Sequence, residues 1–252
     1  MILSRISRAI REQNWFAVAI EFVIVILGVV IGFQISAWNE ARAERAIIAD
    51  QLHEVRADIA AEIGSLDEAL EASLWRLSAA EYLLVAVEGE SDLPDSPVVP
   101  FNQLDRSLLP DIEPEDHPTL LARVNLIRGQ IGRRTGYDSL VNSGNLRLIR
   151  NDEMRIMIQS YYAGYEDLQA NLQIFREIRA AAVPLLYRHG FSLFSNTDVD
   201  TVIDAARNDI ELVAYFRTAR ELGLAQSSAT SSRRDEARRL LALLDAELEG
   251  AE

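Results

Sequence analysis

The most apolar part of the chain lies near its N-terminus, from Trp15 to Trp38, and reads WFAVAIEFVIVILGVVIGFQISAW. As a helix it would span roughly 34 Å, which matches the hydrocarbon core of a bilayer and part of its interfaces. Fourteen Leu, Ile, Val or Phe residues lie between Phe16 and Ile35. They favour insertion by roughly 6 kcal/mol, against a cost of about 3 kcal/mol for Glu21. The pattern predicts a transmembrane helix over 15–38, with Trp15 and Trp38 as anchors at the membrane interfaces.

Charged residues beside this segment predict its orientation. Arg5, Arg8 and Arg11 precede it, and basic residues favour the cytoplasmic side of a membrane. We therefore expect a cytoplasmic arm over 1–14 and an exterior, periplasmic domain over 39–252, held at the inner membrane. A cleaved signal peptide is the alternative, because Ala41-Arg42-Ala43 resembles a cleavage site. The apolar run is longer than signal peptides usually have.

One face of the predicted membrane helix carries small residues. Gly28, Gly32 and Ser36 recur every four residues, a spacing that lets a second helix approach closely. Glu21 falls on the same face, where it would be protonated or hydrogen-bonded across a helix pair. The alternative is that Glu21 reaches toward the headgroups and that the glycines are ordinary membrane-helix residues. The small residues predict a homo-oligomer within the lipid bilayer.

A second apolar pattern follows the membrane segment and predicts a long helix to about residue 87. Its spacing of four, three and four repeats every eleven residues, which keeps the apolar stripe on one side of a nearly straight helix. Because no proline separates the two patterns, we expect the membrane helix to continue into this one. The members of the stripe are Ile48, Leu52, Val55, Ile59, Ile63, Leu66, Leu70, Leu74 and Leu77.

The middle of the chain alternates between loops and shorter helices. Six of the seven prolines fall between Pro94 and Pro118, which predicts a solvated loop without regular structure over about 89–118. Helices are expected over 120–131 and 137–149, with a break at 142–144. Asn151 is a predicted N-cap for a longer helix that Pro184 ends or kinks. We expect its aromatic side chains to lie in the core. The residues at helical spacing along it are Met154, Met157, Ile158, Tyr161, Tyr162, Tyr165, Leu168, Leu172, Phe175 and Ile178.

The last helical region is expected to begin near Asn208, whose spacing to Glu211 matches a capping box. The small polar residues over 227–232 either break this helix or let it pack closely on a neighbour. Its terminal leucines need an apolar partner, and the long first helix offers one in antiparallel orientation. The predicted fold is therefore all-α, with one N-terminal transmembrane helix continuing into a long helix, followed by an antiparallel helical bundle. The leucines are Leu240, Leu241, Leu243, Leu244 and Leu248.

Composition limits the classes of function. Acidic residues outnumber basic ones by 39 to 25, giving a net charge of -14, which disfavours nucleic acid as a partner. The chain has no cysteine, which excludes disulfides and thiolate metal sites. Asp50 and His53 match half of a di-metal motif whose second half is missing, and the other histidines are His117 and His189. Since no catalytic, phosphate-binding or dinucleotide-binding motif occurs, we expect no cofactor, no metal and no enzyme activity.

One region departs from the acidic background. Residues 119–155 hold seven arginines against three acids, a local balance of +4. These arginines either dock an acidic partner or anionic headgroup, or pair with the acids of neighbouring helices. The members of this arginine patch are Arg123, Arg128, Arg133, Arg134, Arg147, Arg150 and Arg155.

Two stretches resemble a family of single-pass bacterial inner-membrane proteins of unknown function. They are NWFAVAIEFVIVILGVVIGFQISAWNEAR at 14–42 and YDSLVNSGNLRLIRNDEMRIMIQSYYAGYEDL at 137–168. The resemblance implies an N-terminal membrane helix with a helical exterior domain; it supplies no activity or catalytic residue and leaves the function open. The leading hypothesis is a membrane-anchored interaction or scaffold protein of the bacterial envelope, with another envelope protein as partner. A ligand-sensing or regulatory subunit of an envelope complex is the alternative, and an unrecognised hydrolase is a third.

Overall fold

The computed structural model describes residues 15–89, 105–128 and 132–250, with side chains except at 15–17, 165–169 and 171. The predicted cytoplasmic arm, 1–14, lies outside these residues. The described part is all-α, as the hydrophobic pattern predicts. The chain divides into two compact units, Met1–Asp50 and Gln51–Glu252.

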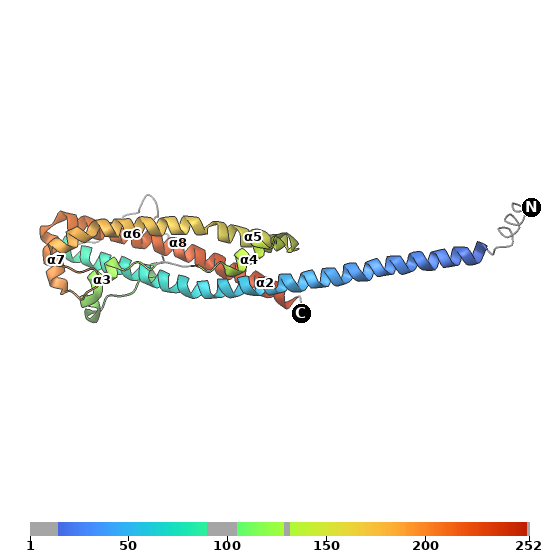
Figure 1. Cartoon of the computed structure of the whole chain (residues 1–252). Coiled ribbons are helices and arrows are strands. Elements are labelled where there is room, and N and C mark those ends of the chain that lie inside the picture. Colours follow the sequence, from blue (N-terminus) through green and yellow to red (C-terminus); the bar gives the residue numbers. More distant parts are fainter. Residues whose placement is uncertain (1–14, 90–104, 129–131, 251–252) are drawn as a thin grey trace, which may run out of the picture. The chain divides into compact units, whose positions relative to one another are not determined.

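The first unit contains the beginning of helix α2, which runs from Trp15 to Glu88 (Figure 1). This helix continues without interruption past Trp38, as the absence of a breaker predicts. Every described side chain over 18–40 is exposed. By length and composition this segment is able to cross a membrane, and a signal sequence near an N-terminus has the same properties.

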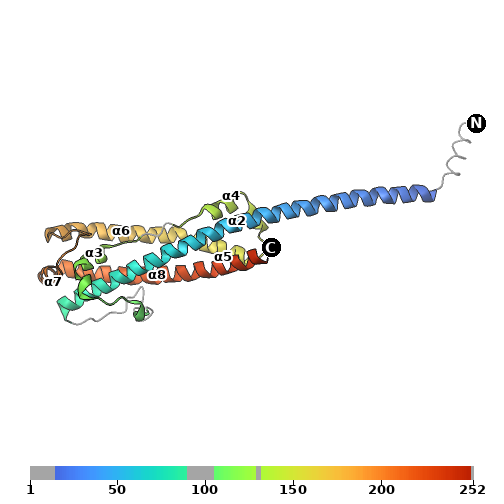
Figure 2. The same cartoon turned by 90° about the horizontal axis from the view of Figure 1, so that it is seen from below.

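The second unit is a helical bundle. The part of α2 after residue 50 runs along it together with α6 and α8 in both views, and α7 lies at one end (Figures 1 and 2). Helix α8 contacts α3, α5, α6 and α7. The α-helices are α3 (Leu120–Asn125), α4 (Thr135–Asn142), α5 (Asp152–Ala163), α6 (Tyr165–Arg188), α7 (Val199–Asn208) and α8 (Ile210–Glu249). Within the described residues, the 3-10 helices are η2 (Arg106–Leu108), η3 (Pro114–Thr119) and η4 (Asn145–Leu148).

Helices α2 and α8 pack antiparallel, which confirms the pairing predicted from the terminal leucines. Leu240, Leu244 and Leu248 are buried, and Leu241 and Leu243 are half-buried. Polar contacts between the two helices run in opposite directions along the chain: Arg56 with Asp245, Arg76 with Gln226, and Glu88 with Arg217.

A glycine sets the closeness of this helix contact. A Cβ atom at Gly223 of α8 would lie 3.1 Å from the backbone nitrogen of Leu77 in α2. Two residues nearby, Ser227 and Thr230, are also buried. Of the two interpretations of the small polar run over 227–232, close packing is therefore right, and α8 continues through it.

The predicted apolar stripe of α2 faces the core. Seven of the nine members are buried, while Ile48 and Ile63 are half-buried. Glu62 is buried beside Ile63, with 2% of its surface exposed. Its carboxylate lies 3.8 Å from the guanidinium nitrogen Nε of Arg233 in α8. Glu62 is thus buried in the core because Arg233 of α8 lies beside it.

Helix α7 was missed by the sequence analysis. Its N-cap is Asp198, whose carboxylate accepts a hydrogen bond from the backbone N–H of Thr201 at 2.9 Å. Its buried face belongs to the cluster that also holds the ends of α2 and α6. An N-cap followed by apolar residues at helical spacing is a signal that could have found it. These residues are Val199, Val202, Ile203 and Ala206.

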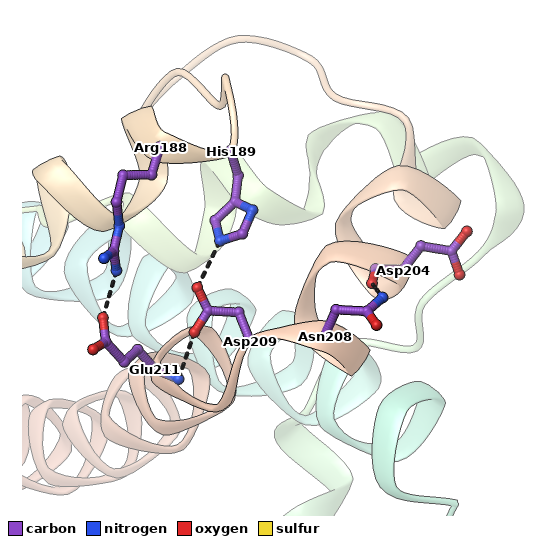
Figure 3. A network of polar contacts seen from close by, with 6 residues as sticks. All are labelled: Arg188, His189, Asp204, Asn208, Asp209 and Glu211. Atoms are coloured by element: carbon purple, nitrogen blue, oxygen red, sulfur yellow. Dashed lines mark hydrogen bonds and ion pairs between the residues drawn. The ribbon is translucent and has the colours of Figure 1, made fainter.

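The predicted capping box at Asn208 and Glu211 is wrong by one residue. Asp209 caps α8, accepting a hydrogen bond from the backbone N–H of Glu211 at 2.9 Å (Figure 3). Asn208 ends α7 instead and donates to the backbone carbonyl of Asp204 at 2.7 Å. The boundary moves because the preceding helix, which was not predicted, includes Asn208.

Other boundaries in the middle of the chain also differ from prediction. Helix α3 ends at Asn125 rather than near 131, and the element over 137–149 divides into α4 and η4 at the predicted break. Asn151 caps α5 as predicted, accepting from the backbone N–H of Met154 at 3.1 Å. The helix that follows is interrupted at Gly164, and α6 continues past Pro184 to Arg188.

The predicted loop over 89–118 is partly described. Its residues 90–104 lie outside the described part of the chain. The remainder is not wholly irregular, because η2 and η3 form within it, with Pro114 at the first position of η3. Nor is it wholly solvated: the hydroxyl of Tyr82 in α2 lies 3.0 Å from Nε2 of His117. This contact joins η3 to the bundle.

Candidate functional site

The predicted association face lies on the exposed part of α2. Glu21, Gly28, Gly32 and Ser36 are spaced by seven, four and four residues, so they share one side of a helix. A Cβ atom at Gly28 or Gly32 would meet no atom within 4 Å. Both small-residue positions are therefore open to a second helix.

Of the two predicted interface anchors, Trp38 has a described side chain and Trp15 does not. Trp38 is 57% exposed, and the guanidinium carbon of Arg42 lies 5.8 Å from its ring centroid. Trp15 begins α2, but its side chain lies outside the described side chains. An exposed indole beside an arginine has the amphipathic character of residues found where a helix leaves a bilayer.

The structure divides the arginine patch into two groups. Four members make ion pairs with acids: Arg123 with Asp116 at 3.1 Å, Arg128 with Glu68 at 2.6 Å, Arg134 with Asp138 at 3.5 Å, and Arg155 with Asp152 at 2.7 Å. Arg133, Arg147 and Arg150 are exposed and make no ion pair with the residues that the structure describes. Of the seven guanidinium groups, these three are open to an acidic partner.

The three histidines do not meet. His53 is exposed, His117 contacts Tyr82, and Nε2 of His189 lies 2.8 Å from the carboxylate of Asp209 (Figure 3). That hydrogen bond is the main reason why the pKa of Asp209 is lowered. Within the described ranges, no group of three His, Asp or Glu side chains is arranged to hold a metal ion.

Buried arginines are the polar feature that sequence analysis missed. Arg233 of α8 approaches Glu62, and its guanidinium carbon lies 3.4 Å from the ring centroid of Tyr161. Arg220 of α8 pairs with Glu81 of α2 at 3.1 Å. Each of these two buried cations thus has a carboxylate from α2, which is the usual condition for burying a charge.

Arg76 of α2 differs from those two arginines. It is only 2% exposed, and its guanidinium donates to Oε1 of Gln226 at 2.6 Å and to the backbone carbonyl of Leu126. Among the described residues, no carboxylate lies within ion-pair distance of it. Burial lowers the pKa of Arg76 to about 10, and the positive charge of Arg179 acts in the same direction. Arg76 still carries its charge at pH 7.

A small cavity lies beside Arg76, where α2, α3, α6 and α8 converge. It has space for about one water-sized molecule. The hydroxyl of Tyr215 donates to Oδ1 of Asn125 at 2.5 Å, and burial raises the pKa of Tyr215 to about 12, so the phenol stays neutral. The polar side chains that line the cavity are Arg76, Asn125, Arg179 and Tyr215.

The sequence contains one signal of this cavity. Arg76 is the single charged residue in the stretch ASLWRLSAA over 72–80, where all sides of α2 except that of Trp75 are buried. A helix segment with apolar or small residues on every side is expected to be covered by neighbours, so a charge within it requires a polar environment.

No family model, no curated protein and no solved structure matches the chain, so its function is inferred from these residues themselves.

Proposed function

We propose that this chain is a membrane-anchored interaction or scaffold protein of the bacterial envelope. The observation that supports the proposal is the apolar segment of α2, whose described side chains from residue 18 to residue 40 are all exposed. Phe22 is 66% exposed and Phe33 is 73% exposed. Soluble proteins rarely leave so long an apolar surface in water. A lipid bilayer is the medium that would cover it along its whole length.

The charges beside the segment support one orientation. Three arginines within the first eleven residues favour a cytoplasmic N-terminus. The helical unit Gln51–Glu252 would then lie on the periplasmic side of the inner membrane. In this position it would present its surface to other envelope proteins or to further copies of the chain.

Two surfaces are suited to partners. The face with Gly28, Gly32 and Ser36 has no covering atoms at its glycines, and small residues let membrane helices approach until their backbones touch. The second surface holds the exposed guanidinium groups of Arg133 and Arg147, which make no ion pair with the residues that the structure describes and would attract an acidic protein. We propose self-association for the first surface and an acidic envelope partner for the second.

Membrane anchoring is tested with the full-length chain in bacterial membrane vesicles. We expect it to resist extraction by alkaline carbonate and to keep its original N-terminus. Protease added to spheroplasts should digest the bulk of the chain from outside. Extraction of the intact chain by carbonate, or cleavage after residue 43, would contradict the proposed anchor.

Self-association is tested by crosslinking in membranes. Gly28→Ile combined with Gly32→Ile should abolish the crosslinked dimer, because branched side chains prevent close helix approach. The matched control is Ile26→Ala combined with Val30→Ala, which changes the opposite side of the helix and should leave the dimer intact. Equal crosslinking in both variants would remove this face from the proposal.

The acidic-partner surface is tested by charge reversal. Arg133→Glu combined with Arg147→Glu should reduce co-purification of acidic envelope proteins with the full-length chain. Arg128→Glu is the control, since Arg128 is already paired with Glu68. The surface does not act by charge attraction if co-purification is unchanged in the Arg133→Glu and Arg147→Glu double variant. The same conclusion holds if Arg128→Glu reduces co-purification equally.

A further inference from the structure

We propose that the helical unit binds one small monovalent anion in the cavity lined by Arg76, Arg179 and Tyr215. The anion has the size of a halide, because the space admits about one water-sized molecule. The site lies entirely within Gln51–Glu252. It is therefore independent of the proposed membrane anchor.

Uncompensated charge is the first reason for an anion. The two acceptors of Arg76, the Gln226 amide and the Leu126 carbonyl, are both neutral. Burying a guanidinium costs several kcal/mol unless a negative charge accompanies it. Arg220 and Arg233 have such partners in Glu81 and Glu62, whereas Arg76 has none among the described residues. A bound anion would supply the missing charge.

A second cation at the same cavity strengthens this reasoning. Arg179 of α6 lines the cavity. Among the described residues, its guanidinium donates a long hydrogen bond of 3.4 Å to the backbone carbonyl of Asn125 and lies 5.8 Å from the ring centroid of Phe194, and both partners are neutral. No carboxylate of the described residues lies within ion-pair distance of Arg179 either. Two like charges near each other repel, and an anion between them replaces that repulsion with two attractions.

The remaining lining indicates which anion fits. The Tyr215 hydroxyl already donates to Asn125, so the guanidinium N–H groups are the donors left for a ligand. Val124, Ile127 and Phe175 supply apolar walls, which disfavour a strongly hydrated divalent anion. Sulfate and phosphate also need more room than one water-sized space. Chloride, a monovalent anion of a single atom, meets both conditions.

The test is a thermal unfolding titration of the full-length protein in detergent micelles. Potassium chloride replaces potassium gluconate at constant ionic strength, since gluconate is too large for the cavity. Raising chloride from its Kd to 100 times its Kd should increase Tm by about 5–9 °C along a saturable curve. A parallel titration with acetate tests the size limit: stabilisation by chloride alone is the expected result, and equal stabilisation by acetate would contradict a halide site.

Variants decide whether the effect belongs to this cavity. Arg179→Gln should abolish the chloride dependence while keeping the fold, because Arg179 is only half-buried. Arg150→Gln is the matched control and should keep the full dependence, since Arg150 is exposed and unpaired among the described residues. Arg76→Gln should also abolish it; if this variant does not fold, Arg179→Gln decides alone.

The position of the bound anion can be determined in crystals of the protein soaked in bromide. One anomalous peak between the guanidinium groups of Arg76 and Arg179 is the expected result. The proposal is overturned if Tm is the same in chloride, acetate and gluconate, or if the rise persists in Arg179→Gln. Arg76 would then be a purely structural link from α2 to Gln226 and Leu126. Neither outcome changes the membrane extraction or crosslinking results.

Discussion

The two parts of α2 treat apolar and charged side chains in opposite ways. In the part over 18–40, large apolar residues such as Phe22 and Phe33 are exposed. After residue 50, the charged residues Glu62 and Arg76 are each only 2% exposed. A single helix therefore contains both an apolar surface without a protein cover and charges inside a core.

This difference shows that burial follows the surroundings of a helix rather than its residue types alone. The exposed segment has no packed neighbour among the described residues of the first unit, so its apolar surface requires another medium or another chain. The buried charges are stabilised by side chains of α8 or by backbone carbonyls. Substitutions in the exposed segment and in the bundle test this difference.

Charges placed in the exposed apolar segment should have the largest effect. Ile26→Lys combined with Val29→Lys puts two ammonium groups near its middle and should oppose insertion by about 6–8 kcal/mol. Carbonate extraction should then release the chain. Ala43→Lys combined with Ile47→Lys, beyond the apolar segment, serves as control and should stay in the membrane fraction. If both variants remain bound, the segment is not what holds the chain in the bilayer.

Removing a buried charge partner should have the next largest effect. Glu62→Ala removes the buried carboxylate beside Arg233, which keeps its ion pair with the more exposed acid Glu236, and should lower the free energy of unfolding by about 3–5 kcal/mol. Glu68→Ala removes the exposed partner of Arg128 and should cost about 1 kcal/mol or less. Urea denaturation of the two variants measures the difference. Equal losses would mean that the Glu62 contact adds nothing beyond a surface pair.

Two glycines in the second unit differ in the space that a side chain would have. A Cβ atom at Gly136 would overlap the backbone nitrogen of Val55, so Gly136→Ala should destabilise the bundle by about 1–3 kcal/mol. Gly64 meets no atom within 4 Å, so Gly64→Ala should stabilise α2 by about 0.5–1 kcal/mol. Thermal unfolding should shift in opposite directions. A shift in the same direction would contradict the close approach of α4 to α2.

The smallest change in stability is expected in the partly exposed polar network at the end of the bundle (Figure 3). The hydrogen bond from His189 lowers the pKa of Asp209 below its usual value near 4. Its stabilising contribution is therefore complete above that pH and is lost as pH falls through the lowered pKa. Asp209→Asn should reduce Tm at pH 7, and the difference from the unmodified chain should shrink toward pH 2. Asp204→Asn, a surface control, should show a smaller change at both pH values.

Much of the fold was predictable from short-range patterns. The extent of α2, most members of its apolar stripe, the N-cap at Asn151 and the antiparallel pairing of the terminal leucines all follow from spacing and composition. The first three features depend on residues within a few turns of one another, which their order in the sequence specifies directly. The pairing joins distant segments and was predictable because both helices carry an apolar stripe that needs a cover. The possibility of membrane insertion follows in the same way, because transfer free energies add along a single segment.

Contacts between distant segments decided the rest. Glu62 becomes a core residue through Arg233, and Arg76 through Gln226 and Leu126. The arginine patch divides into paired and unpaired members for the same reason, since Glu68 of α2 reaches Arg128 across the bundle. A buried charge is stable only when the fold places an interacting group beside it. The spacing of residues along one helix does not specify which residue of another segment that group belongs to.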